Sequence, residues 1–218
     1  KNRINLQGLT NTGNIKTTGD ITALNTLNAG KIIAEGNVSI LDLENQNELV
    51  INKLLTTNNL TNTGALSTGE GIISNGNAIN HGELKTNGSF VINGNLNNYN
   101  ILNVGNILST RDLLNYGNLK AVEKLLTRGT TFYNQGEILA SNLDVDNTNI
   151  QNINKITVIE NAKLKGNNIN NQGHLSGTNI DLITSALTNS SQIIADGIIT
   201  ANNTNLNKST EVNYTLGF

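Results

Sequence analysis

The sequence predicts an all-β protein: a right-handed single-stranded parallel β-helix, or β-solenoid, of about 12 coils with 17 to 19 residues each. A short phrase, Asn-x-Gly-x-aliphatic, recurs along the chain, apolar and polar residues alternate after it, and proline is absent. A repeat this short buries its apolar side only by stacking on neighbouring copies, and proline would break the hydrogen bonds between them. The phrase begins at Asn11, Asn28, Asn45, Asn62, Asn80, Asn98, Asn115, Asn134, Asn152, Asn171 and Asn189.

The third position of the phrase is predicted to be a backbone corner. It is Gly in most copies and Asn at Asn47, Asn100 and Asn154, while Ser191 is the one exception. Gly and Asn share a tolerance of the left-handed backbone region that other side chains avoid. We therefore expect one left-handed residue in each coil.

The fifth position is predicted to start the buried row of a first strand. It is a branched aliphatic in every copy, including Val212 of a twelfth copy that begins at Lys208. Two residues later the chain is small or apolar in most copies, as at Ala34, and the residue between is often polar, as at Lys85. This period-2 alternation is typical of a strand with one buried face.

A second alternating stretch follows in each repeat, as in residues 38–40, 143–145 and 180–182, and a further aliphatic precedes the next Asn, as at Leu27, Leu60 and Ile79. Such a repeat fits one coil of a β-helix, and twelve coils about 4.8 Å apart make a rod of roughly 50 to 60 Å. An α-helical repeat does not fit, because the copies are too short and rich in poor helix formers.

The repeat runs from the first residues to the last without a linker or a charge block, which indicates one repeat domain over residues 1–218, and we expect the natural protein to continue on both sides. The hydrophobic content of 36% suffices for the thin core of a solenoid. A net charge of −2 with 14% charged residues provides no basic field for nucleic acid or an acidic membrane surface. No apolar run is long enough to insert into a bilayer, and zero Cys excludes disulfides and thiolate sites. We expect no metal and no cofactor.

Carboxylates are the only candidates for catalysis, because His81 and His174 lie about five coils apart. Asp144 and Asp146 share one face of a strand and would suit a sugar-cleaving site. In the next coil, however, Lys163 and Lys165 align over them, which favours structural ion pairs. The same reasoning pairs Lys31 with Glu48 and Glu137 with Lys155.

The second position of the phrase holds the candidate binding surface. His81, Tyr99 and Tyr116 occupy it in three successive coils, so their rings should form a line along one edge of the rod, with Tyr133 just before the next corner. Such a line could bind a sugar or a partner protein. The alternative is stacking between coils, which stabilises the rod.

The eleven Asn residues at the first position are predicted to form a ladder. An inward-pointing Asn can donate its side-chain amide to a turn carbonyl of the next coil. Asp and Ser suit turns equally well, yet neither replaces Asn at this position in those copies.

The segments NAGKIIAEGNVSILDLE and NQGEILASNLDVDNTNIQ resemble the haemagglutinin repeat of filamentous haemagglutinin-like exoproteins, which Gram-negative bacteria export by two-partner secretion. The resemblance covers essentially the whole chain. It implies the right-handed β-helical shaft of a large secreted adhesin or toxin-delivery stalk, a role in virulence, and an outer-membrane transporter as partner during secretion. The secretion domain of that family carries Asn-Pro motifs, so this proline-free chain resembles the shaft.

We therefore expect a structural and adhesive shaft of a secreted, cell-surface bacterial exoprotein, which mediates or extends attachment to host or neighbouring cells. It would be no enzyme and no obligate oligomer, and its partner would be a host-cell glycan or surface protein. Two rivals remain. A β-helical polysaccharide lyase or glycoside hydrolase needs long inserted loops that form a groove, and an ice-binding β-solenoid needs a flat array of regularly spaced Thr.

Overall fold

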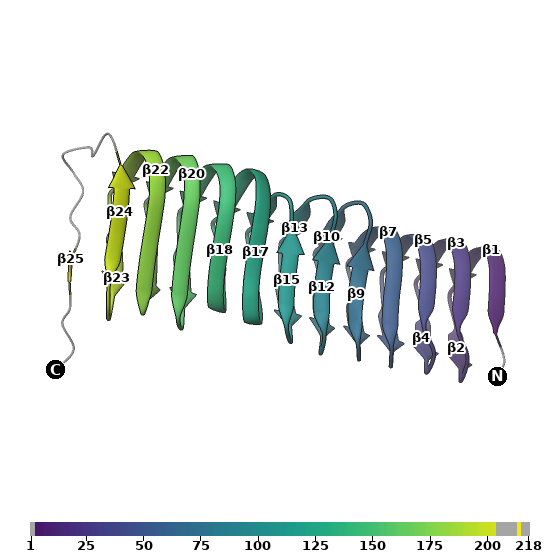
Figure 1. Ribbon diagram of the computed structural model, residues 1–218. Coiled ribbons are helices and arrows are strands. Elements are labelled where there is room, and N and C mark those ends of the chain that lie inside the picture. Colours follow the sequence, from purple (N-terminus) through teal and green to yellow (C-terminus); the bar gives the residue numbers. More distant parts are fainter. Residues whose placement is uncertain (1–2, 204–212, 215–218) are drawn as a thin grey trace.

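The computed structural model describes residues 3–203 and 213–214. Over these residues the chain is an all-β solenoid of about 11 stacked parallel coils without helices, which confirms the predicted β-solenoid class. The coils lie side by side along one axis, with β1 (Ile4–Asn11) at one end and β24 (Ile199–Asn203) towards the other (Figure 1). The twelfth copy of the phrase, from Lys208 to Val212, lies outside the described residues.

The first strand of each coil begins at the fourth position of the phrase, directly after the corner. In most coils it is four residues long and ends at the next corner. These strands are β2 (Asn14–Thr17), β4 (Lys31–Ala34), β6 (Glu48–Ile51), β8 (Ala65–Thr68), β11 (Glu83–Thr86), β14 (Ile101–Val104), β19 (Lys155–Val158), β21 (His174–Gly177) and β23 (Gln192–Ala195). In β17 (Asn118–Asn134) and β18 (Glu137–Asn152) the first strand continues unbroken through the rest of the coil.

The remainder of each coil returns the chain to the next Asn. It is one bent strand in β3 (Ile21–Asn28), β5 (Val38–Asn45), β7 (Leu54–Asn62), β20 (Asn161–Asn171) and β22 (Asn179–Asn189). It divides into shorter strands in the middle coils, namely β9 (Gly71–Ser74), β10 (Ala78–Asn80), β12 (Ser89–Ile92), β13 (Leu96–Asn98), β15 (Ile107–Thr110) and β16 (Leu113–Asn115). The last described strand, β25 (Asn213–Tyr214), pairs with β23.

The core is a stack of inward rows in which each residue lies over its equivalent in the next coil. Leu84 pairs in register with Leu102, and both are completely buried. One inward row differs from the prediction. Leu27 and Ile79 point outward, because the Asn that follows each of them is itself buried and side chains alternate along a strand. Thr26 and Ala78 take the inward place instead.

The corners also differ from the prediction. Among the described residues no non-glycine residue has a positive φ, and Gly71, which is not at a third position, is the one glycine that does. From Gly30 onward, the third-position glycines are required by the preceding coil. A Cβ added to Gly82 or Gly136 would collide with the carbonyl oxygen of the third-position glycine in the preceding coil.

Glycine and non-glycine corners make different hydrogen bonds. In both kinds, the second-position N–H donates to the carbonyl of the Asn in the preceding coil, as Tyr99 does to Asn80 at 2.8 Å. Only at glycine corners does the third-position N–H donate to that carbonyl as well, as Gly136 does to Asn115 at 3.1 Å. Because glycine has no side chain, neighbouring coils approach closely enough at glycine corners to form this additional hydrogen bond. The Asn corners do not form it.

We expect Gly136→Ala to destabilise the protein by about 1 to 3 kcal/mol, because the new methyl group must push two coils apart. Gly13→Ala is the matched control. A Cβ at Gly13 meets no atom within 4 Å, so its effect should stay within about 0.5 kcal/mol. Thermal melts followed by circular dichroism provide the comparison, and equal losses for the two variants would contradict this account of the corner.

Candidate functional site

The eleven first-position Asn side chains form a continuous amide ladder inside the solenoid. Each is 0 to 5% exposed. From Asn11 to Asn171, every Nδ2 donates to the Oδ1 of the Asn in the following coil at 2.7 to 2.9 Å, so Asn189 is the last acceptor. The ladder has one direction, since each amide donates towards the C-terminal end of the rod.

The second N–H of the same amides binds backbone. Asn28 donates to the carbonyl of Glu48 at 2.9 Å, and Asn115 to that of Glu137 at 3.1 Å. This carbonyl belongs to the fourth position of the next coil, one residue beyond the corner that the sequence suggested. The side-chain acceptor, the Oδ1 of the next Asn, was not anticipated. Each Asn thus fixes both the next amide and the start of the next strand.

Four surface rings of the middle coils, those of His81, Tyr99, Tyr116 and Tyr133, lie together along one corner of the rod. His81 and Tyr99 are stacked with centroids 4.3 Å apart and an angle of 8° between planes. Tyr99 and Tyr116 are stacked at 5.0 Å and 2°. Tyr133 approaches Tyr116 at 5.6 Å but is tilted by 50°. Its hydroxyl lies 3.1 Å from the Gln135 side-chain oxygen, to which it donates.

This geometry limits what the aromatic line can bind. A sugar ring stacks on an open aromatic face, but the faces of Tyr99 are covered by His81 on one side and by Tyr116 on the other. The exposed fractions of 42% for Tyr99 and 40% for Tyr116 therefore belong mainly to ring edges and hydroxyl groups. The line is a stack between coils that presents an edge to solvent.

The charged residues pair in part as the sequence predicted. Lys31 and Glu48 form an ion pair at 2.8 Å, and Lys165 and Asp146 form one at 3.0 Å. Glu137 and Lys155 are in register across β18 and β19, but these two described residues form no ion pair. Register alone does not bring every pair of long side chains into contact.

The ion-pair partners of Asp144 differ from the one that the sequence predicted. It is in register with Lys163 of β20, yet it forms ion pairs with Lys124 at 2.9 Å and Arg128 at 2.7 Å, both on the preceding coil. Partial burial acts to raise the pKa of Asp144, but hydrogen bonds and positive charge from Arg128 and Lys124 outweigh it, so the pKa lies below its ordinary value. A carboxyl held ionised in this way is unsuited to act as a general acid.

Sequence reasoning missed Lys124 and Arg128 because it compared only charged residues that lie directly opposite each other in register on neighbouring strands. Between Ala121 and Lys124, β17 has one residue more than the matching segment of β18, so the register between the two strands shifts there. That shift and the length of the Arg side chain bring Arg128 diagonally to Asp144. The length of the step from Asn115 to Asn134, 19 residues, was the one available signal.

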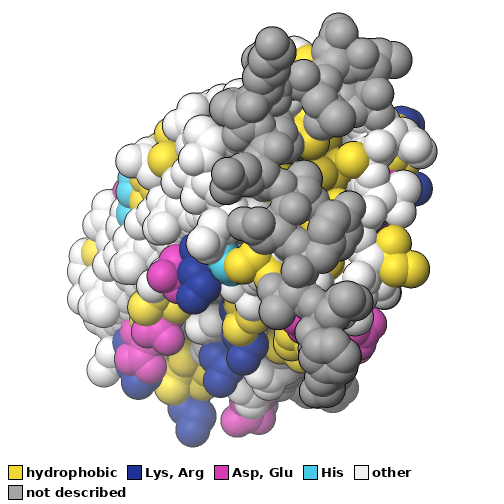
Figure 2. Space-filling model, turned by 90° about the vertical axis from the view of Figure 1, so that its left-hand side faces the viewer, with side chains coloured by type: hydrophobic (Ala, Val, Ile, Leu, Met, Phe, Trp, Pro, Cys, Tyr) yellow, Lys and Arg dark blue, Asp and Glu magenta, His cyan; other side chains and the backbone are white. Residues whose placement is uncertain are grey.

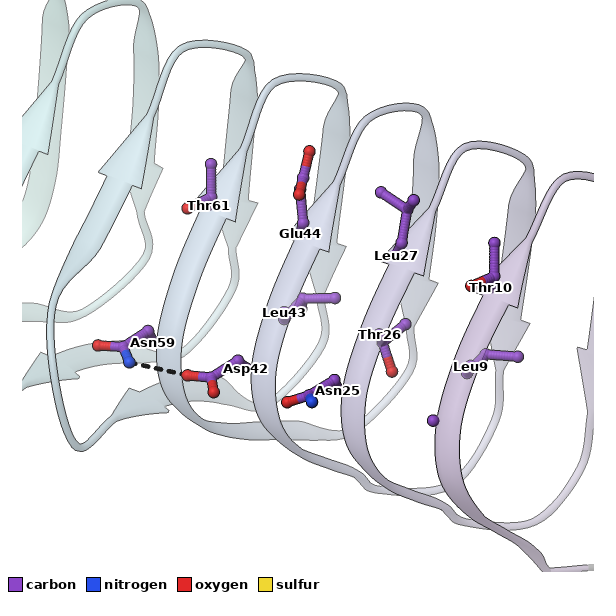
Figure 3. A pocket seen from close by; sticks show the side chains of 11 residues that line it. Leu9, Thr10, Asn25, Thr26, Leu27, Asp42, Leu43, Glu44, Asn59 and Thr61 are labelled. Carbon is purple, nitrogen blue, oxygen red and sulfur yellow. Dashed lines mark hydrogen bonds between the residues drawn. The ribbon is translucent and has the colours of Figure 1, made fainter.

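A shallow groove runs across β1, β3, β5 and β7, with a volume of about 450 Å³ (Figure 3). Its side chains lie in rows along the rod, one of which contains Asn25, Asp42 and Asn59. Asp42 accepts a hydrogen bond from the Asn59 amide at 2.7 Å, and Glu44 accepts one from Gln46 at 2.6 Å. Both carboxylates are held by neighbouring amides, which is the arrangement of a structural surface.

The remaining surface is mainly uncharged and polar. Viewed from the end that carries β23 and β24, the Lys, Arg, Asp and Glu side chains gather towards one side of the rod (Figure 2). His174 lies in β21, in the C-terminal half of the chain and far from His81. Its Nδ1 is 3.3 Å from the Gln192 side-chain oxygen. A surface amide row missed by the sequence reasoning runs from Asn142 through Asn161 to Asn179.

In the part of the chain that the structure describes, no helix has the length and apolar character needed to cross a membrane. The same residues contain no group of three or more His, Asp or Glu side chains arranged to hold a metal ion.

Comparison with known proteins yields no relative: no family model, no curated protein and no solved structure matches the chain.

We expect Asn115→Ala to destabilise the protein by about 3 kcal/mol, since it leaves the amide of Asn98 and the carbonyl oxygen of Asn134 buried without their partners. Asn118→Ala, an exposed site of the same residue type in the same coil, should cost less than about 0.5 kcal/mol. Chemical denaturation curves of the two variants test the ladder, and equal midpoints would show that it contributes no stability.

Proposed function

We propose that this chain is a structural shaft that spaces and supports an attachment function. The observation that carries the proposal is the unbroken amide ladder, which links ten successive pairs of coils by the same hydrogen bond. The steps between coils differ by at most two residues. A uniform stack of this kind has a defined length and resists bending, as a spacer requires.

The hydrogen bonds between coils support a load-bearing role. Backbone and amide hydrogen bonds both run from one coil to the next, along the axis of the rod. A pull along that axis is therefore shared by all the bonds between two coils. The buried rows add apolar contact at each interface, as between Leu164 and Leu182. Failure at one interface would release one coil.

The resemblance to haemagglutinin repeats extends the proposal to a location. We place the shaft on a secreted surface exoprotein of a Gram-negative bacterium, with an outer-membrane transporter as its partner during export. A chain without cysteine, in which each completed coil offers amide hydrogens to the next, suits folding outside the cell one coil at a time. The polysaccharide-cleaving rival has less support, because Asp144 and Asp146, the carboxylates considered for it, are both held in ion pairs.

Stretching of single molecules by the two chain ends tests the shaft. We expect stepwise unfolding in which each step releases about 60 Å, the extended length of one coil of 17 to 19 residues. A variant that lacks residues 45–61, one complete coil, should keep the fold by placing Asn28 against Asn62 and should show one step fewer. A single global unfolding event, or extension without steps, would argue against a load-bearing stack of coils.

The aromatic line carries a second candidate function, adhesive contact. Exposed edges of His81, Tyr99 and Tyr116 lie on one corner of the rod, and the covered ring faces favour a surface protein over a glycan as partner. Tyrosine edges combine apolar area with a hydroxyl group and are enriched where proteins bind proteins.

A binding assay on cultured host cells tests this contact. The double variant Tyr99→Ala with Tyr116→Ala should lose most of the cell-bound signal, and prior protease treatment of the cells should lower binding of the unaltered protein. Leu24→Ala with Leu41→Ala removes an equally exposed apolar pair elsewhere on the rod, 49% and 50% exposed, and should bind normally. If the tyrosine variant binds cells as well as the unaltered protein does, the aromatic line has no adhesive role.

A further inference from the structure

Tyr99 and Tyr116 have a geometry that goes beyond stacking. Their rings are parallel within 2°, their centroids are 5.0 Å apart, and about two fifths of each residue is open to solvent. They occupy the same position in consecutive coils, and the strands that lead to them, β13 and β16, are in register from Leu96 and Leu113 onward. The two phenols are therefore held next to each other by the backbone.

The neighbours of this pair make it selective. The other face of Tyr99 is covered by His81, whose ring is 4.3 Å away, so Tyr116 is the phenol that Tyr99 meets. Tyr116 has Tyr133 as a second neighbour, but that ring is farther away, at 5.6 Å, and tilted by 50°. Moreover, Tyr133 is drawn towards its hydrogen bond with Gln135.

We propose that Tyr99 and Tyr116 form an oxidative cross-linking site, which a haem peroxidase with hydrogen peroxide converts to dityrosine. Each phenol gives one electron and its hydroxyl proton to the oxidant and becomes a phenoxyl radical with spin density on the carbons ortho to oxygen. The radicals join through one ortho carbon of each ring. Those two carbons then release their protons, both oxygens regain a proton, and the rings become aromatic again. In total two hydrogen atoms leave the pair and reduce one peroxide molecule to two waters.

The link would join two coils covalently. It closes a loop of one coil between residues 99 and 116, and a cross-link of that size restricts the unfolded chain much as a disulfide does. This chain has no cysteine, so tyrosine would supply the staple that a disulfide provides elsewhere. On this basis we expect oxidation to raise the melting temperature by roughly 5 °C or more.

The sequence makes the site easy to map. Trypsin cleaves after Lys and Arg, so the three neighbouring tyrosines fall on separate peptides, Tyr99 on 86–111, Tyr116 on 112–120 and Tyr133 on 129–155, and the fourth tyrosine of the chain falls on 209–218. The purified full chain, at low concentration, is treated with a haem peroxidase and hydrogen peroxide, and the monomer fraction is digested. We expect dityrosine fluorescence and a linked species of 86–111 with 112–120 whose mass is lower by two hydrogen atoms than the sum of the two peptides.

Phenylalanine variants keep the stacked rings and remove single hydroxyl groups, so the fold is preserved. Tyr99→Phe should abolish the link between 86–111 and 112–120, whereas Tyr133→Phe should leave its yield unchanged. Circular dichroism confirms that both variants are folded before oxidation. A wild-type product that links 112–120 to 129–155 instead, dityrosine found only in covalent dimers, or equal loss in the two variants would each overturn the assignment.

Discussion

The amide ladder is the constraint on which the rest of the structure depends. An Asn buried in every coil is acceptable only if both its N–H groups and its oxygen find partners, because an unsatisfied amide in the core is costly. The neighbouring coil supplies those partners when its own Asn lies directly above. A slip of one residue would break the ladder and turn every core side chain outward. Coil length and register follow from this single requirement.

The features that repeat at one position could be predicted from the sequence, because in-register stacking converts repetition in the chain into rows in space. The fifth-position aliphatics, such as Leu84, are buried as expected, and the strands of the β-solenoid follow the predicted alternation. The corner was predicted for the wrong reason. Glycine there is a requirement of contact between coils, since Gly136 lies against the carbonyl of Gly117, and no local reading of backbone preference reveals that.

Side chains that reach across the surface were the least predictable. Asp144 has cations in the coils on both sides, and the sequence alone gives no reason to favour one over the other. The outcome depends on a register shift in the coil of β17, which brings Arg128 close enough to bind. Short side chains such as Asn have too little reach for such choices, so the ladder could be anticipated although its acceptor atoms were not.

The same stacking rule decides what the aromatic line can do. Coils spaced by hydrogen-bonded strands place equivalent side chains about 4.8 Å apart, which is close to the contact distance of aromatic rings. Rings that repeat at one position therefore cover one another, as Tyr99 and Tyr116 do, and their faces are used in holding the rod together. Only the ring edges and the hydroxyl groups are then open to a binding partner. The close contact between the rings favours a reaction between neighbouring tyrosines. In a solenoid this regular, repetition strengthens the shaft at the expense of the open faces that ligand binding would need.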